Sequence, residues 1–183
     1  DGKLRAKGAF SLKIVPVNDL PVAADDTATV DEVTSTGAEA QPPKTTATIN
    51  LLTNDSDVED GKPSEVAVSN VVNATVANIG GGKVVVTADG DFSGDVTFTY
   101  TVMDRAGATA TANVTLTINP VNDPPRAKND SVTITEDETP QISVMTNDSD
   151  PEGDTLSIAT VGTPAHGTAQ INGTKIDYVP DQN

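Results

Sequence analysis

The chain has 183 residues, of which 27 are acidic and 11 are basic, so its formal net charge is −16. Such an acidic surface repels the phosphates of nucleic acids and anionic lipids, and we expect no nucleic-acid partner and no direct membrane insertion. There is no cysteine, which excludes disulfides and thiolate metal sites. No apolar run has the length of a membrane span. The chain starts abruptly at Asp1, so we expect it to be a segment of a longer protein.

The first predicted element is the last strand of a preceding module. Residues 4–15 place Phe10, Leu12 and Ile14 in one phase, which is typical of a strand with one buried face. A stiff linker follows at residues 16–21, because its prolines cannot continue a ladder of backbone hydrogen bonds.

Segments rich in threonine and valine then predict seven strands. The clearest is at residues 96–102, where apolar residues alternate strictly with threonine, and residues 110–118 alternate in the same way after a short turn. These two segments predict a β-hairpin. The other strands are expected near residues 26–30, 46–52, 65–72, 75–79 and 83–88. About seven short strands in roughly 100 residues are typical of an immunoglobulin-like sandwich.

Two blocks of sequence occur twice and define the size of the module. Residues 14–21 match residues 118–125 at an offset of 104, and residues 53–57 match residues 146–150 at an offset of 93. The difference predicts a loop insertion around residues 34–44 in the first copy. We therefore expect residues 1–19 to end one module, residues 20–122 to form a complete module, and residues 123–183 to begin a third that lacks its last two strands.

Three motifs carry a resemblance to a known family. The Pro-Val-Asn-Asp-x-Pro linker, the Asn-Asp-Ser-Asp loop and the strand at residues 96–102 resemble repeats of giant bacterial surface adhesins of the RTX type. Such repeats are described as cadherin-like or bacterial immunoglobulin-like. The linker is also similar to the calcium-binding Asp-x-Asn-Asp-Asn linker of cadherins, although its first Asp and last Asn are missing. The resemblance implies an all-β fold of tandem immunoglobulin-like (cadherin-like) Greek-key β-sandwich repeats, in an extracellular or cell-surface protein.

The order of the strands predicts which acidic side chains meet at the first joint. If successive strands run in alternating directions, the second strand ends at the same end (pole) of the module at which the linker enters, so the loop that follows it lies there. The loop between the last two strands lies at the same pole. We therefore expect this joint to gather Asn18, Asp19, Asp55, Asp57, Glu59 and Asp104.

The opposite pole is expected to form the second joint. It would bring Glu32, Asp89 and Asp91 of the complete module to the next linker and acidic loop, which contain Asn122, Asp123, Asp148, Asp150, Glu152 and Asp154. So many carboxylates do not stay ionised together without a cation. Calcium suits them because it takes about six to eight oxygen ligands in flexible geometry, whereas zinc prefers nitrogen or sulfur.

The spacing within the acidic loop supports calcium. Residues 148–154 place acids at alternate positions with Gly153 at the sixth, as in the first half of an EF-hand loop, although no helices flank it. The alternative is a solvated turn, because Asp and Asn are good turn formers. The first copy departs from this spacing, since Asp60 precedes Gly61. Two acidic loops beside two matched linkers nevertheless favour calcium.

The sequence therefore predicts a calcium-rigidified extender segment of a large secreted or cell-surface adhesin, with neighbouring repeats of the same chain as its partners. The alternative is a carbohydrate- or protein-binding module of an adhesin or of a polysaccharide-degrading enzyme, whose partner is a polysaccharide or a host or cell-surface protein. Carbohydrate-binding surfaces usually present exposed aromatic rings, and the candidates for such rings are Phe92 and Tyr178. Phe98 and Tyr100 are not candidates, because they alternate in phase with the residues predicted to be buried. Tyr100 is instead expected to hydrogen-bond across a loop. We expect the chain not to be an enzyme. Its single histidine, His166, has no serine or cysteine nucleophile nearby in the sequence and is predicted to be an exposed turn residue.

Overall fold

The structure is a computed structural model that describes residues 8–34, 43–135 and 137–182. Parts of two predictions lie outside these residues: the start of the first predicted strand and most of the predicted loop insertion. The described remainder of that predicted strand, residues 8–15, forms no strand, so the prediction is wrong there; its apolar side chains Phe10, Leu12 and Ile14 are exposed and have no sheet to pack against. Every regular element in the described part is a β-strand. Within that part, no helix has the length and apolar character needed to cross a membrane.

Seven strands occupy the region predicted to form the complete module. They are β1 (Asp26–Asp31), β2 (Thr45–Asn50), β3 (Glu65–Val72), β4 (Thr75–Gly80), β5 (Lys83–Ala88), β6 (Gly94–Met103) and β7 (Thr109–Asn119). Each overlaps a predicted strand, and β3 and β5 have the predicted bounds. The β-branched residues that dominate these segments suit a pleated, half-buried surface, which explains why the alternation located them.

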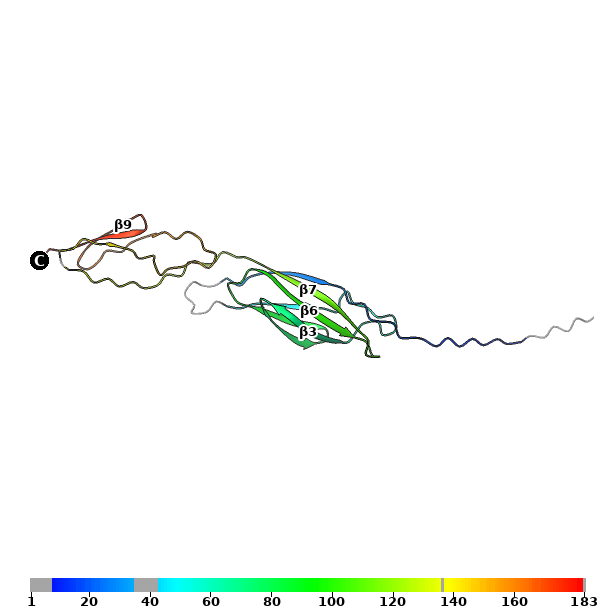
Figure 1. The fold of residues 1–183 in the computed structure, drawn as a ribbon. Coiled ribbons are helices and arrows are strands. Elements are labelled where there is room, and N and C mark those ends of the chain that lie inside the picture. The colour runs from blue at the N-terminus through cyan, green and yellow to red at the C-terminus, as the bar shows by residue number, and fades with distance from the viewer. Residues whose placement is uncertain (1–7, 35–42, 136, 183) are drawn as a thin grey trace, which may run out of the picture.

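The seven strands form two sheets, one with the order β1-β7-β6-β3 and the other with the order β2-β5-β4. β1 runs parallel to β7, and the other pairs are antiparallel. The predicted hairpin is confirmed as β6 and β7, with Val96 opposite Leu116 and Phe98 opposite Val114. The ribbon in Figure 1 shows these strands side by side along the module.

The core lies between the two sheets and is made by alternate residues of the strands. Its buried apolar side chains are Ile49, Leu51, Leu52, Val84, Val86, Ala88, Val96, Phe98, Tyr100, Val102, Ala112, Val114, Leu116 and Ile118. The predicted buried phase of β6 and β7 is therefore confirmed. The all-β architecture of two packed sheets is an immunoglobulin-like β-sandwich, as the sequence predicted.

Tyr100 connects the core to the loops at one pole. Its hydroxyl lies 2.9 Å from the carbonyl oxygen of Ala24, 3.2 Å from that of Leu51 and 3.0 Å from Oδ1 of Asp55. The predicted hydrogen bond across a loop is confirmed. It ties the entry of the chain into the sandwich to the loop that follows β2.

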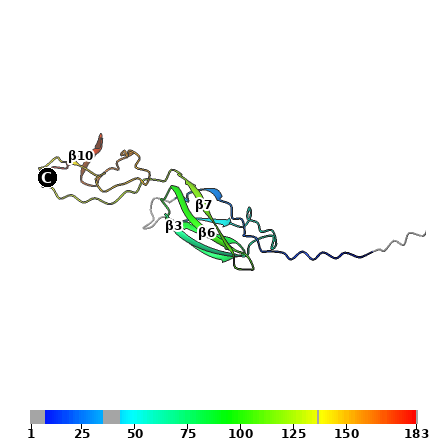
Figure 2. The same cartoon turned by 45° about the vertical axis from the view of Figure 1, so that its right-hand side comes forward.

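Residues 123–182 form a second, smaller sheet. Its strands are β8 (Gln141–Ile142), β9 (Gly167–Asn172) and β10 (Lys175–Pro180), in the order β8-β10-β9, and both pairs are antiparallel. In Figures 1 and 2 this region continues from the end of β7, while residues 8–19 leave the sandwich at its opposite end. The two matched linkers therefore lie at opposite poles, as the strand order predicts.

Candidate metal centre

The first acidic loop, residues 55–61, folds around one of its own side chains. Oδ1 of Asp57 accepts hydrogen bonds from the backbone N–H groups of the second and third residues after it, at 2.9 and 2.7 Å. Gly61, with a φ of 80°, closes the loop through two backbone hydrogen bonds with Asp57. The closed loop directs Glu59 toward the linker, where its Oε2 accepts the N–H of Asp19 at 3.2 Å.

The second acidic loop, residues 148–154, repeats this arrangement. Oδ1 of Asp150 accepts the N–H groups of Glu152 and Asp154, both at 3.1 Å. Oε2 of Glu152 accepts the N–H of Asp123 at 3.1 Å, which is the contact that Glu59 makes with Asp19 in the first copy. The shared contact with the linker is therefore built twice, although the glycine stands one position earlier in the second loop and its bonds to the second aspartate differ in detail.

Each acidic loop is also tied to its linker by a backbone bridge. Val22 and Ser56 exchange two hydrogen bonds, at 2.8 and 3.0 Å, and Arg126 and Ser149 exchange the equivalent pair at 2.7 and 3.1 Å. Each serine lies between the two aspartates of its loop. The bridge therefore holds those aspartates beside the linker.

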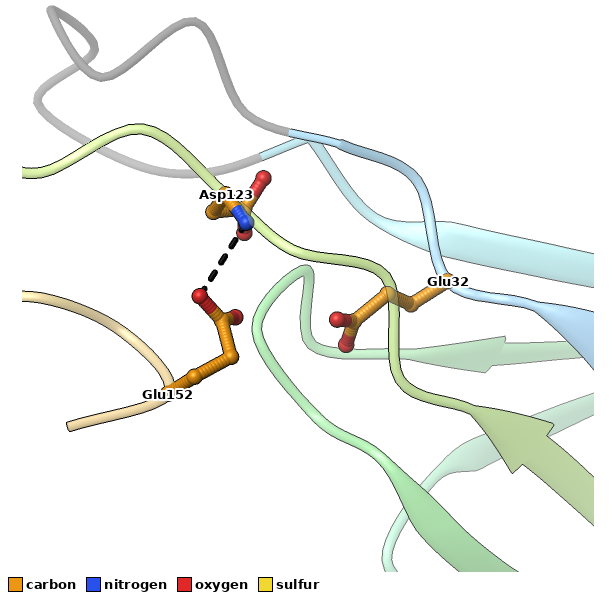
Figure 3. A group of neighbouring side chains, drawn as sticks. All are labelled: Glu32, Asp123 and Glu152. Carbon is orange, nitrogen blue, oxygen red and sulfur yellow. Dashed lines mark hydrogen bonds between the residues drawn. The ribbon is translucent and has the colours of Figure 1, made fainter. Parts of the chain in front are cut away.

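Three carboxylates from different segments converge at the second joint. Glu32 follows β1, Asp123 lies in the linker after β7, and Glu152 comes from the second acidic loop. One carboxylate oxygen from each lies within 4.8 Å of the others, and Figure 3 shows the three side chains directed toward a common space. Among the described residues, this is the one group of three or more acidic or imidazole side chains arranged closely enough to hold a metal ion.

Burial makes this cluster electrostatically costly. Glu32 is 5% exposed and Asp123 is 1% exposed, while Glu152 is exposed. Oε1 of Glu32 accepts the N–H of Val121 at 2.8 Å, whereas its buried Oε2 has no hydrogen-bond partner among the described residues. A buried carboxylate oxygen without a partner costs free energy, and a cation placed between the three carboxylates would offset both that cost and their mutual repulsion.

The chemistry of the ligands favours a hard cation. All three side chains offer carboxylate oxygens, which suit calcium, and the described cluster contains neither nitrogen nor sulfur ligands. Because the carboxylates come from the sandwich, the linker and the following module, one ion bound among them would contact all three segments.

The structure brings most of the residues predicted for the first joint close to the linker. Nδ2 of Asn18 donates to Oδ2 of Asp104 at 2.8 Å. This hydrogen bond holds the pKa of Asp104 below its ordinary value; burial opposes the shift, and N–H groups of its own turn reinforce it. Asp57 is buried, and its Oδ2 has no hydrogen-bond partner among the described residues. Asp19 and Glu59 are joined by the backbone contact described above.

Two predicted ligands bond mainly to the chain of their own module. Oδ1 of Asp55 accepts the N–H of Ala24 at 2.9 Å and lies within reach of the Tyr100 hydroxyl. Its equivalent, Asp148, accepts the N–H of Lys128 at 2.8 Å. These carboxylates brace the start of each module, a role that the alternating acids in the sequence did not reveal.

The remaining predicted residues lie around the second joint without entering the three-carboxylate cluster. Asn122 donates to the carbonyl oxygen of Asp123 at 3.1 Å, and Asp154 is exposed. The Asp89 side chain is 92% exposed, with Lys44 at 3.9 Å. Asp91 is paired with Arg126, a residue that the sequence interpretation did not single out. A position-by-position comparison of the two copies marks Arg126 as a difference, because its equivalent is Val22, but it does not identify Asp91 as the partner.

The aromatic candidates for sugar binding are engaged within the fold. Phe92 packs against the core of the sandwich. The Tyr178 hydroxyl donates to the carbonyl oxygen of His166, whose side chain is exposed at a bend, as predicted. Neither ring forms a flat, fully exposed platform.

Comparison with known proteins assigns the family. The model of the bacterial Ig domain matches residues 18–117 and 122–183, so the chain belongs to the bacterial Ig domain family. Membership of this family indicates an extracellular structural or adhesion module.

Solved structures that resemble the chain include protocadherin gamma C5 EC1-3, at 16% identity and a TM-score of 0.45, over 92% of this chain and 60% of that one. They also include the endo-fucoidan hydrolase MfFcnA4 from glycoside hydrolase family 107, at 16% identity and a TM-score of 0.40, over 88% of this chain. The chain spans 24% of the length of that hydrolase. A search of curated proteins gave no match.

Proposed function

We propose that this chain is a structural extender segment of a large bacterial adhesin of the RTX type, displayed at the cell surface or secreted, in which calcium stiffens the joints between modules. Its principal partners are the neighbouring modules of the same protein. It serves as a spacer and carries out no catalysis of its own.

The convergence of Glu32, Asp123 and Glu152 is the observation that supports this proposal most directly. Their oxygens lie within 4.8 Å of one another, and two of the three side chains are buried. Without a cation, each carboxylate lies beside two like charges, and opening the joint relieves their repulsion. With calcium, the same charges become ligands, and the joint is held closed.

The expected affinity matches an extracellular setting. Extracellular modules typically bind calcium with dissociation constants of about 0.1 to 1 mM. An ion that binds only the closed joint stabilises that state by about 2.7 kcal/mol when its concentration is 100 times the dissociation constant. The joint is then stiffest in calcium-rich fluid and loses this stabilisation where calcium is scarce.

A calcium titration followed by NMR tests the proposal at this joint specifically. The backbone N–H groups of Val121 and Asp123 each donate to a carboxylate of the cluster, so their resonances report on it. We expect both to shift in a saturable manner. Glu32→Gln should raise the dissociation constant at least about tenfold, because it removes a buried ligand charge.

Asp31→Asn is the matched control for that substitution. It makes the same change of charge one residue away, but Asp31 is exposed and accepts the side-chain amide of Asn119 at 2.9 Å. Calcium affinity should be unchanged in this variant. Resonances that do not move up to about 10 mM calcium, or equal affinities for Glu32→Gln and Asp31→Asn, would contradict the proposal.

A second candidate function, carbohydrate binding, is favoured by one observation. A shallow groove of about 340 Å³ on the outer face of the four-stranded sheet is lined by Ser69, Asn70, Thr99, Thr111, Ala112 and Asn113. Hydroxyl and amide groups of this kind suit a polyhydroxylated ligand. A glycan array with the intact chain distinguishes the candidates: binding abolished by Thr99→Val would support a sugar site, and no binding would support the spacer.

A further inference from the structure

A second contact crosses the same joint and involves a cationic side chain of the protein. Nη2 of Arg126 lies 2.9 Å from Oδ1 and 2.8 Å from Oδ2 of Asp91. The two side chains are 26% and 27% exposed, so the pair is largely removed from solvent. Asp91 lies in the turn between β5 and β6 of the sandwich, and Arg126 follows the linker. The ion pair therefore joins the two modules.

The backbone of Arg126 extends this connection to the proposed calcium site. Its N–H and carbonyl groups bond to Ser149, and Ser149 stands immediately before Asp150 in the second acidic loop. Asp150 in turn accepts the N–H of Glu152. Hydrogen bonds and one peptide bond thus connect Asp91, on the sandwich, to the loop that presents Glu152 to Glu32 and Asp123.

The first joint has the same backbone bridge with a different side chain. Val22 occupies the position equivalent to Arg126, exchanges hydrogen bonds with Ser56 in the same geometry, and is 58% exposed. The arginine is therefore not required to build the linker or the acidic loop. Its effect can be removed by installing the residue that the other copy already carries.

We propose that the Asp91–Arg126 pair is a metal-independent latch, which holds the second joint near its closed geometry and so pre-positions the carboxylates for calcium. Arg126 is then a positioning residue for that site. The latch itself follows from the ion pair alone, whereas its effect on calcium affinity rests on the proposed function. A partly buried pair is screened by salt less than an exposed one, so the latch persists at physiological ionic strength. If latch and calcium favour the same joint geometry, each strengthens the other by the same factor.

Distances between spin labels on the two modules test the latch. The chain has no cysteine, so Ala106→Cys, at an exposed turn, and Lys175→Cys, at the exposed first residue of β10, introduce one label in the sandwich and one in the following module. Pulsed electron spin resonance then gives the distribution of distances. In chelator, we expect a narrow distribution for the otherwise unchanged chain and a clearly broader one for Arg126→Val.

Three controls separate the latch from general effects of charge and folding. Arg105→Val removes the same charge from an exposed arginine of the sandwich and should leave the distribution narrow. The double variant Asp91→Arg, Arg126→Asp exchanges the two charges and should give a distance distribution narrower than that of Arg126→Val. The melting temperature of the sandwich should be unchanged by Arg126→Val, because Arg126 lies outside its core.

Calcium is then added to the same samples. Saturating calcium should narrow the distribution for Arg126→Val. Its calcium midpoint, followed in both proteins through the N–H resonances of Val121 and Asp123, should be roughly fivefold higher than that of the parent, as expected for the loss of one partly buried ion pair. Equal widths for the parent and Arg126→Val in chelator would overturn the latch. A difference in chelator with no response to calcium in either protein would uphold the latch and refute the proposed calcium function.

Discussion

The sandwich and the region of residues 123–182 share the same acidic loop but differ in the core beneath it. Leu51 and Leu52 are 0% and 9% exposed in the sandwich, whereas their sequence equivalents Val144 and Met145 are half-buried. Val144 and Met145 line an open groove of about 550 Å³, where the sandwich has β6 and β7 packed over its core.

The two acidic loops nevertheless have matching hydrogen bonds. Glu59 contacts the linker N–H at 3.2 Å and Glu152 at 3.1 Å, and in each loop the second aspartate accepts the N–H of that glutamate. The loop is therefore built by local hydrogen bonds and by the linker, and a complete core is not required. Stability of the module and chemistry of the joint are separate properties, which substitutions can change one at a time.

The largest effect is expected from the core of the sandwich. Phe98 is 2% exposed and central, so Phe98→Ala should lower the free energy of unfolding by about 4 kcal/mol. Ile176→Ala, at a half-buried residue of β10, should cost about 1 kcal/mol in the unfolding of residues 123–182. Urea denaturation with NMR signals assigned to each region measures both. Comparable losses would mean that the two cores are equally packed.

A smaller effect should distinguish the two bracing aspartates. Asp55 is 3% exposed and bonds both Ala24 and Tyr100, so Asp55→Ala should cost about 2 to 3 kcal/mol. Asp148 bonds the equivalent N–H of Lys128 but is half-buried, and Asp148→Ala should cost less than about 1 kcal/mol. The same denaturation experiment gives both values, and Tyr100→Phe should reproduce a part of the Asp55 loss.

Much of the sandwich was predictable because strand periodicity is a local property. Strict alternation of valine, phenylalanine and tyrosine with threonine marked β6 and its buried face, and the repeated linker located the joints. The meeting of Glu32 with Asp123 also followed from strand order, since β1 and β7 both lead to the second pole.

The orientation of individual carboxylates could not be predicted from the order of the residues. Alternate acids look equivalent, yet Asp55 turns toward Tyr100 while Asp57 closes its own loop. This division depends on backbone direction within a loop of a few residues. The Asp91–Arg126 pair was missed for another reason: it depends on the relative placement of two modules, which no periodicity encodes.

The pH dependence of stability tests the half-buried carboxylate of Asp26, which lies beside Asp55 of the first acidic loop. Burial raises the pKa of Asp26 above its ordinary value; the Tyr100 hydroxyl opposes the shift and the Asp55 carboxylate adds to it. A raised pKa means that the stabilising contribution is fully present below the unfolded-state pKa and is lost as the pH rises through the folded-state value. Asp26→Asn cannot ionise, so its stability relative to the parent should increase from about pH 3 to pH 7. Asp130→Asn, at the exposed equivalent position, is the control and should leave the unfolding of residues 123–182 unchanged.

The smallest effect is expected at the first joint, where Asn18 contacts Asp104. Loss of that hydrogen bond in Asn18→Ala should raise the pKa of Asp104 toward its ordinary value, as measured by carboxyl NMR in chelator. The rise should be incomplete, because the N–H of Ala108 still donates to Oδ1 at 2.7 Å. A depressed pKa stabilises the fold above the unfolded-state pKa, and this contribution is lost as the pH falls through the folded-state value. The small destabilisation by Asn18→Ala should therefore be seen at neutral pH and disappear in acid.

Asn122→Ala is the matched change at the second joint. Asn122 donates to a backbone carbonyl instead of to Asp104, so this variant should leave the titration of Asp104 unaltered. An unchanged titration in Asn18→Ala would show that the linker does not rest against Asp104 in solution. The first joint would then be open without metal, and the contrast with the latched second joint would be larger than the structure indicates.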